Sequence, residues 1–160
     1  MPSYWANRSQ QREWLSQFCE GIGLDIGCGY KKIVPDAIGL DMREYDPLCV
    51  ADVIGNSYRL PFRNESMNYM IACHVLEHFS NPVSILLEFY RVLKSRGILA
   101  LAVPDSERAP ETMYDPLHLF GFTEFNLLQI VQANGFEPQK LCKFNEGGWP
   151  CLTLSALRKE

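Results

Sequence analysis

An apolar run that ends in a glycine-rich turn lies near the start of the chain, at residues 22–29, with the sequence Ile-Gly-Leu-Asp-Ile-Gly-Cys-Gly. The apolar part predicts a short buried strand, and the glycines that follow it predict a tight turn. In sheets of parallel strands, ligands bind beyond the carboxyl ends of the strands, where such a turn lets a ligand approach the backbone. The turn therefore predicts an α/β fold and the position of its ligand site.

The rest of the chain alternates short apolar runs with helical patterns. We expect further strands at residues 37–40, 48–51, 69–73 and 98–103. Helices are expected over residues 7–20, from Pro82 to about residue 93, and from Glu124 to Asn134-Gly135. The last two apolar segments, 136–144 and 149–157, flank Asn-Glu-Gly-Gly and predict a hairpin.

This order of elements predicts a Rossmann-like, mainly parallel sheet with helices on both faces and a C-terminal antiparallel hairpin. The 160 residues suffice for one core but not for two ordinary domains. We therefore expect a single domain over residues 1–160, with an N-terminal helix in residues 1–20 and the Rossmann-like core in residues 21–160.

Charge and apolar content exclude several kinds of partner. The formal net charge is −4, and acidic and basic residues are mixed along the chain, so we expect no nucleic acid partner. The N-terminus lacks a signal-peptide pattern, and no apolar run approaches the roughly 20 residues that span a bilayer, so we expect a cytoplasmic protein without a membrane partner. Six widely spaced cysteines without a CxxC pair predict reduced thiols.

The glycine turn departs from the dinucleotide-binding pattern. That pattern requires a third glycine, GxGxxG, whereas Gly29 is followed by Tyr30, Lys31 and Lys32. An oxidoreductase that uses a nicotinamide or flavin cofactor is therefore disfavoured, although it remains a rival with the same fold.

Several motifs resemble, in order, those of class I S-adenosylmethionine-dependent methyltransferases, in particular the small methyltransferase-11-like domain. They are LDIGCG at 24–29, GLD at 39–41, AD with LPF at 51–62, HVLEH at 74–78, RVLKSRGILALAVP at 91–104 and FTEFNLLQIVQANGF at 122–136. The resemblance covers roughly residues 21–140. It implies S-adenosylmethionine as the cofactor and methyl transfer to a small-molecule acceptor.

The resemblance also implies the residues that bind the cofactor. Asp25, Gly27 and Gly29 would shape the turn around the methionine part, with Cys28 contributing its backbone. Asp41 would accept hydrogen bonds from the ribose hydroxyls, which is a task for an ionised carboxylate.

The remaining implied contacts lie at the ends of later strands. Asp52 would meet the adenine amino group, the Val53 backbone the ring edge, and Met42 or Ile54 the ring face. Cys73 and His74 would approach the methionine portion and the substrate. Asp41 and Asp52 could instead be turn residues, and His74 could be structural.

The segment His74-Val75-Leu76-Glu77-His78 also matches the HxxEH zinc signature of a peptidase class. That signature needs both histidines on one face of a long helix, whereas here the motif follows a strand directly and Asn81-Pro82 opens a new helix. We therefore expect no metal.

A base helps if the acceptor is a hydroxyl or a protonated amine. His118, in the loop Asp-Pro-Leu-His at 115–118, is the best candidate and His74 the second, although a loop histidine can simply bind its own loop. Asp105 and Glu77 could orient an acceptor or be solvated acids, and the sequence does not separate these roles.

Two departures from the family bear on function. Residues 30–35 are too few for a full helix after the first strand, and no sizeable cap is inserted before the last helix. We expect the N-terminal helix and residues 104–121 to meet the substrate, and a second copy of the chain in a homodimer could complete the pocket. The rival from another class is a non-catalytic S-adenosylmethionine-binding or scaffold subunit, which would bind the cofactor without methyl transfer.

Overall fold

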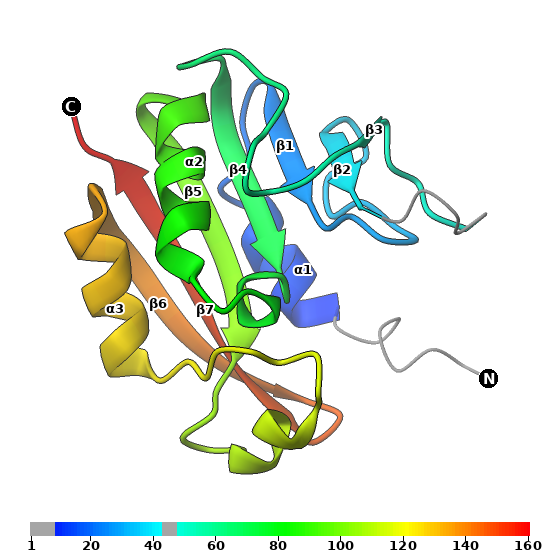
Figure 1. The fold of residues 1–160 in the computed structure, drawn as a ribbon, viewed down its shortest axis with the longest axis vertical. Coiled ribbons are helices and arrows are strands. Elements are labelled where there is room, and N and C mark those ends of the chain that lie inside the picture. Colours follow the sequence, from blue (N-terminus) through cyan, green and yellow to red (C-terminus); the bar gives the residue numbers. More distant parts are fainter. Residues whose placement is uncertain (1–8, 43–47) are drawn as a thin grey trace.

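Seven strands form one sheet in the part of the chain that the computed structural model describes, residues 9–42 and 48–160 (Figure 1). The strands are β1 (Gly23–Ile26), β2 (Ile38–Asp41), β3 (Val53–Ile54), β4 (Met67–Cys73), β5 (Leu93–Pro104), β6 (Phe136–Glu146) and β7 (Trp149–Arg158). Their order across the sheet is β3-β2-β1-β4-β5-β7-β6. Strands β1 to β5 pair in parallel, and β7 pairs antiparallel with both β5 and β6. The predicted sheet and its terminal hairpin are confirmed.

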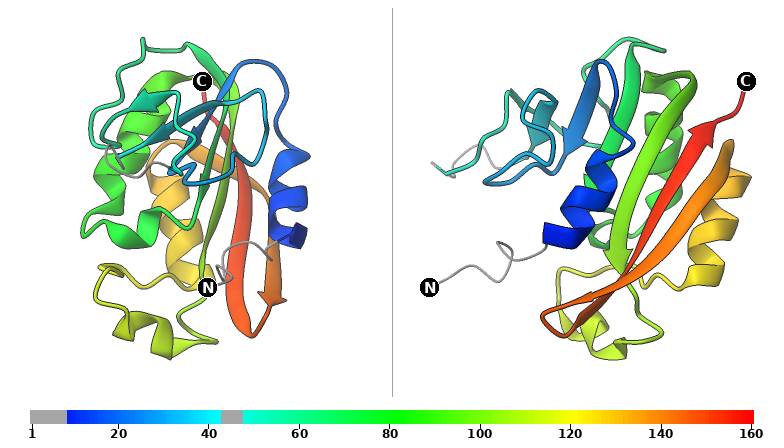
Figure 2. Two further views of the ribbon diagram at one scale, coloured as in Figure 1. Left: turned by 90° about the vertical axis from the view of Figure 1, so that its right-hand side faces the viewer. Right: turned by 180° about the vertical axis from the view of Figure 1, so that it is seen from behind.

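Helices cover both faces of the sheet, as predicted. Helix α1 (Ser9–Ser16) lies on one face, and α2 (Pro82–Val92) and α3 (Glu124–Ala133) lie on the other (Figure 2). Alternating residues of the central strands supply the two cores, because successive side chains point to opposite faces. In β5, Leu99 and Leu101 join the larger core under α2 and α3, whereas Ala100 packs with Trp14 and Leu15 of α1.

Side-chain caps place the starts of two helices where the sequence predicts them. The Asn81 side chain accepts a hydrogen bond from the Ser84 amide at the start of α2, and Pro82 occupies the first turn. At α3, Thr123 and Asn126 form a reciprocal capping box, with distances of 3.2 and 2.9 Å. Local residues thus determine both boundaries.

The strand predicted at residues 48–51 is wrong, because β3 is Val53–Ile54. The apolar residues of that run are not buried: Leu48 is 69% exposed and Val50 39%. The Val50 amide donates to the Gly29 carbonyl at 2.8 Å, so this segment supports the glycine turn. Burial of an apolar run depends on neighbours that the run itself does not specify.

Two further boundaries differ from expectation. Helix α2 ends at Val92, and Leu93 begins β5 opposite Met67, five residues before the strand predicted at Ile98. Helix α1 ends at Ser16, before the predicted residue 20, and residues 7 and 8 lie outside the described part of the chain.

The loops match the expectation that β1 is followed by no full helix. Residues 30–37 form turns and bends and lead directly into β2. Beyond β5, the chain forms a short 3₁₀ helix, η3 (Pro110–Tyr114), and another, η2 (Leu76–His78), follows β4. No disulfide bond joins any of the six cysteines, all of which lie in the described part of the chain. In the described part of the chain, no helix has the length and apolar character that crossing a bilayer requires.

Candidate functional site

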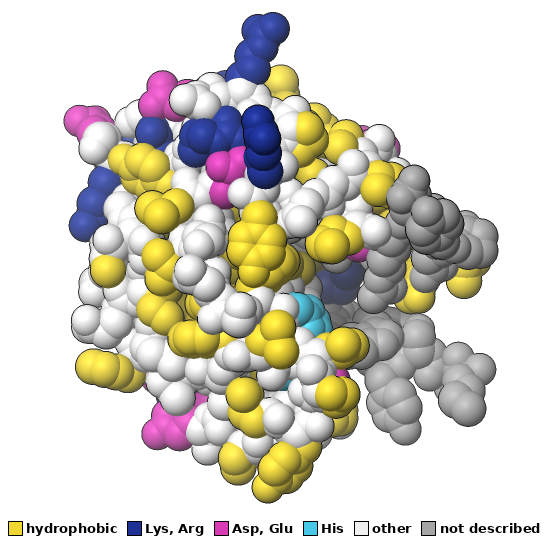
Figure 3. All heavy atoms as spheres, viewed as in Figure 1, with side chains coloured by type: hydrophobic (Ala, Val, Ile, Leu, Met, Phe, Trp, Pro, Cys, Tyr) yellow, Lys and Arg dark blue, Asp and Glu magenta, His cyan; other side chains and the backbone are white. Residues whose placement is uncertain are grey.

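A pocket of about 190 Å³ lies at the carboxyl ends of β1, β2 and β4. It contains four residues that the sequence analysis assigns to the cofactor, Gly27, Asp41, Met42 and His74. The lining is completed by Leu40, Ser57, Val75, His78 and Phe79. In Figure 3, histidine side chains reach the surface at this end of the sheet among hydrophobic side chains. The location is the one expected for a ligand in a parallel sheet.

The glycine turn presents bare backbone to the pocket. Gly27 has φ +67°, and a Cβ on it would lie 2.5 Å from Cγ2 of Val75. Gly29 has φ +53°, and apart from its two chain neighbours no described residue has an atom within 4 Å of the place of its Cβ. The left-handed backbone explains the need for glycine at both positions, and the open space at Gly29 lets a ligand approach the main chain.

Asp41 connects the end of β2 to this turn. Its carboxylate is buried, and Oδ2 accepts a hydrogen bond from the Gly29 amide at 2.9 Å. A carboxylate has about four acceptor sites on two oxygens, so it can hold a backbone amide and also accept from ligand hydroxyls. The arrangement therefore places an oriented acceptor beside the open turn.

Asp25 and Cys28 lie behind the turn rather than in the pocket lining. Asp25 is 2% exposed, and its Oδ2 accepts from the Ile33 amide at 2.5 Å, which holds the loop after β1. Burial raises the pKa of the Asp25 carboxyl to about 6. The Cys28 thiol packs beside Gly39, and burial raises its pKa to about 12. Both residues shape the turn from its protein side.

Asp52 lies outside the pocket lining and is held by Lys32. Its Oδ2 accepts from Lys32 Nζ at 2.6 Å and from the Gly39 amide at 2.8 Å. The hydrogen bond from Lys32 holds the pKa of Asp52 below its usual range. Val53 follows as the first residue of β3, and Ile54 is half exposed. The structure thus does not bring this group into the enclosed space beside Asp41.

The end of β4 orients His74 between two elements. The residue has φ +56°, and its Nδ1 lies 3.2 Å from Oε1 of Glu77. Its Nε2 lies 3.0 Å from Oε1 of Gln11 in α1. Both ring nitrogens are therefore engaged by the protein, which suits a positioning role better than proton transfer. Cys73 packs against the core under α1.

His118 is not part of the pocket lining, but its ring contacts that of His78, which is. Nδ1 of His118 is 2.7 Å from the Thr112 carbonyl oxygen, which only accepts, so Nδ1 carries a proton. Its Nε2, which has the lone pair in the neutral ring, lies 3.9 Å from Oδ2 of Asp115. The ring lies against that of His78, with centroids 5.2 Å apart, and His78 lines the pocket. The structure thus brings His118 to the outer end of the site.

Sequence reasoning missed several lining residues. The HVLEH motif contains Val75 and His78 and was a usable signal for both, because it follows the end of β4 directly. No motif in the sequence marks Ser57 or Phe79 as pocket residues. Both lie in loops, and whether they reach the pocket beside Gly27 depends on the path of those loops in the folded chain.

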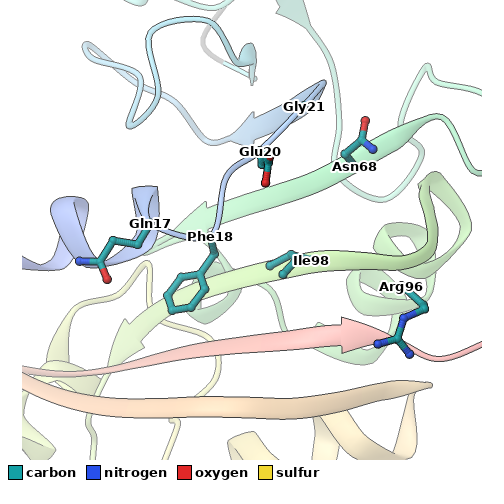
Figure 4. A pocket seen from close by; sticks show the side chains of 7 residues that line it. All are labelled: Gln17, Phe18, Glu20, Gly21, Asn68, Arg96 and Ile98. Atoms are coloured by element: carbon teal, nitrogen blue, oxygen red, sulfur yellow. The ribbon is translucent and has the colours of Figure 1, made fainter.

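A larger cavity, about 530 Å³, lies at the opposite end of the sheet (Figure 4). Gly21 precedes β1 and Asn68 lies at the start of β4, so this cavity is at the amino ends of the strands. Phe18, Glu20 and Arg96 also line it. It contains none of the residues that the resemblance assigns to the cofactor, and parallel sheets bind ligands at their other end.

The strand order, the bare glycine turn and the acid at the end of β2 define a Rossmann-like nucleotide-binding protein of the methyltransferase type. The chain belongs to the family of S-adenosylmethionine-dependent methyltransferases: the family described as "Methyltransferase domain" matches residues 13–101, more than half of the chain. S-adenosylmethionine is the cofactor of this family.

Two curated relatives are similar in sequence. One, from Mycolicibacterium smegmatis, bears the name "Probable S-adenosylmethionine-dependent methyltransferase" and is 27% identical over 146 residues, which are 82% of this chain and 54% of that protein. The other, an uncharacterised protein of Methanocaldococcus jannaschii, is 29% identical over 60% of this chain and 51% of its own length. The chain spans about half the length of the curated relatives it matches.

Solved structures share the fold. A protein of Thermotoga maritima described as a SAM-dependent methyltransferase superposes with a TM-score of 0.79 at 20% identity, covering 93% of this chain and 88% of that one. A methyltransferase in complex with the Haloferax volcanii Trm112 activator has a TM-score of 0.77 at 14% identity, with the same two coverages. At these identities the likeness shows the fold alone.

Proposed function

We propose that this protein transfers a methyl group from S-adenosylmethionine to a small-molecule acceptor. The observation that carries the proposal is the hydrogen bond between the Gly29 amide and Asp41 at the open end of the glycine turn. It combines a close backbone approach with an oriented acceptor for ribose hydroxyls in one place. Family membership supplies the reaction type.

The residues fit the cofactor in the following way. Gly27 and Gly29 would let the methionine part lie against the backbone, and Asp41 would accept from the ribose. Asp25 and Cys28 would hold the turn in shape, and Met42 would pack on the adenine. For Asp52, Lys32 and Gly39 both donate to Oδ2, so we assign Oδ1 to the adenine amino group, with Val53 beside it.

When bound, S-adenosylmethionine supplies an already activated sulfonium methyl group. The protein's remaining task is to align the acceptor and exclude water. We assign the alignment to His74, with Cys73 before it, because Glu77 and Gln11 fix the His74 ring at the pocket wall.

We assign proton removal from the acceptor to Nε2 of His118, since the Thr112 carbonyl holds the proton on Nδ1. The adjoining segment exposes four large apolar or aromatic side chains, Met113, Tyr114, Leu117 and Leu119, beside the carboxylate of Asp115. An acceptor with an apolar body and a hydroxyl or amine group matches these neighbours.

The test is calorimetric titration with S-adenosylmethionine and, separately, NADH. We expect the former alone to bind, and Asp41→Ala to weaken that binding at least about tenfold, because it removes a charge-assisted hydrogen bond. Asp36→Ala, which removes an exposed acid just before β2, is the matched control and should change little. Binding of NADH alone, or of neither compound, overturns the proposal. Cofactor binding without transfer to any acceptor in a broad panel would favour a scaffold subunit.

A further inference from the structure

Glu77, His78 and His118 form a compact cluster at the outer end of the pocket. Each offers one ligand atom, a carboxylate oxygen or a ring nitrogen, and the three atoms lie within 4.8 Å of one another. Glu77 and His78 belong to η2, whereas His118 comes from the loop after η3. The amides of Leu119 and Phe120 donate to the Glu77 carbonyl, at 2.7 and 3.1 Å, and so fasten this loop to η2.

Both histidines are oriented by backbone carbonyls. Nδ1 of His78 lies 2.9 Å from the Leu117 carbonyl oxygen, and Nδ1 of His118 lies 2.7 Å from that of Thr112. Because a carbonyl only accepts, both Nδ1 atoms carry protons, and in the neutral rings the lone pairs lie on Nε2. Histidines that bind metals have this arrangement, with the far N–H donated to a carbonyl or carboxylate.

The Glu77 carboxylate is the second, independent indication. The residue is 1% exposed, and Oε1 is 3.2 Å from Nδ1 of His74. Its Oε2 is buried and has no hydrogen-bond partner among the described residues. A buried carboxylate oxygen without a partner is costly, and a cation between the imidazoles and this carboxylate would remove that cost.

We propose that Glu77, His78 and His118 bind a divalent transition-metal ion of the Zn²⁺ class. Two imidazoles and a carboxylate suit such an ion, and three protein ligands leave a position open for another molecule. Tetrahedral ligands at about 2.0–2.1 Å from zinc lie roughly 3.4 Å apart, so a small closure of the loop completes the geometry. His78 also lines the cofactor pocket, which puts the open position beside the acceptor.

This site differs from the HxxEH match in the sequence, which pairs His74 with His78. In the structure, His74 is held by Gln11 and Glu77, and His118, which lies 40 residues after His78, supplies the second imidazole.

The role of the ion rests on the proposed function: it would bind an acceptor oxygen and lower the pKa of a hydroxyl there. Nε2 of His118 cannot hold a proton and a metal together. The general-base role assigned to His118 above therefore applies to the metal-free protein, and in the metal-bound protein the ion would activate the acceptor hydroxyl instead.

The experiment titrates the chelator-treated, full chain with Co²⁺ as a spectroscopic probe and then displaces it with Zn²⁺. We expect one equivalent to give ligand-field bands without a thiolate charge-transfer band. Loss of a group that merely orients a metal ligand costs about 10–100-fold in affinity, so His78→Gln and His118→Gln should each cost at least that. Cys49→Ser is the control, because Cys28, Asp41 and Cys49 form the other described cluster that could hold an ion.

A thiolate band that Cys49→Ser abolishes, or unchanged affinity in His118→Gln, overturns the site. Thermal unfolding without metal shows whether each variant folds. Because His78 is exposed, we expect His78→Gln to disturb the core least. S-adenosylmethionine is titrated into the same samples. Cofactor binding without cobalt binding overturns the metal site alone, and cobalt binding without cofactor binding overturns the methyltransferase proposal alone.

Discussion

Gly27 is the residue where backbone conformation and packing act together. An alanine there would have to adopt φ +67°, and its Cβ would meet Cγ2 of Val75 at 2.5 Å. Gly147, in the turn between β6 and β7, has nearly the same φ, +62°, but no described atom lies within 4 Å of its Cβ position. The two glycines therefore separate the cost of the left-handed backbone from the cost of the clash.

We expect Gly147→Ala to lower the free energy of unfolding by about 1–2 kcal/mol, the usual cost of a left-handed residue with a Cβ, and to leave S-adenosylmethionine affinity unchanged. Gly27→Ala should lower stability further and weaken cofactor binding at least about tenfold, because the clash displaces Val75, and both residues line the pocket. Urea unfolding and calorimetric titration measure the two effects. Equal effects of both substitutions on affinity would show that the clash is relieved elsewhere.

Asp25 gives the protein a predictable pH dependence. Its folded-state pKa is about 6 because the carboxyl is buried, against an ordinary value of 3.8. Between these values the folded state keeps a proton that the unfolded state has released. The contribution of Asp25 to the free energy of unfolding therefore falls as pH rises from about 4 to about 6 and is constant above. The full change is on the order of 3 kcal/mol at most.

Asp25→Asn isolates this contribution, because the amide oxygen can still accept from Ile33 but cannot titrate. Urea unfolding at several pH values should show the wild type losing stability relative to the variant between pH 4 and 6. If the unfolding free energies of the two proteins changed with pH in parallel, the raised pKa of Asp25 would be contradicted.

At the scale of elements, the caps of α2 and α3 predict different sensitivities. Thr123 and Asn126 form a two-way capping box at α3, whereas Asn81 reaches the Ser84 amide at 3.4 Å, near the limit of a hydrogen bond. Thr123→Ala should therefore cost about 1 kcal/mol of unfolding free energy, and Asn81→Ala about half of that. Denaturant unfolding of both variants measures these losses of unfolding free energy, and a larger loss in Asn81→Ala than in Thr123→Ala would contradict the prediction.

At the scale of the whole molecule, the cofactor should stabilise the fold, because the contacts that we propose for it come from β1, β2 and β4 together. Ligand at 100 times its dissociation constant adds about 2.7 kcal/mol, which for a domain of this size raises the melting temperature by about 5–10 °C. Thermal scans with S-adenosylmethionine measure the shift. Asp41→Ala, if it weakens binding at least about tenfold, should show at most about half of this shift at the same ligand concentration. An equal shift would mean that Asp41 makes no contact with the ligand.

The sequence by itself determined the elements whose signals are local. The apolar run that ends in Gly27 and Gly29 specifies β1 and its turn, and the caps at Asn81 and Thr123 specify two helix starts. Such signals lie within a few residues of one another and therefore need no knowledge of the rest of the chain.

Only the tertiary structure decided which distant residues meet. In the sheet, β7 lies between β5 and β6, and the third strand is Val53–Ile54 rather than the predicted residues 48–51. Asp52 is paired with Lys32. The tertiary structure also brought His118 against His78 at the rim of the pocket. These contacts depend on loop paths and on burial by other elements, and neither is encoded in the segments that they join.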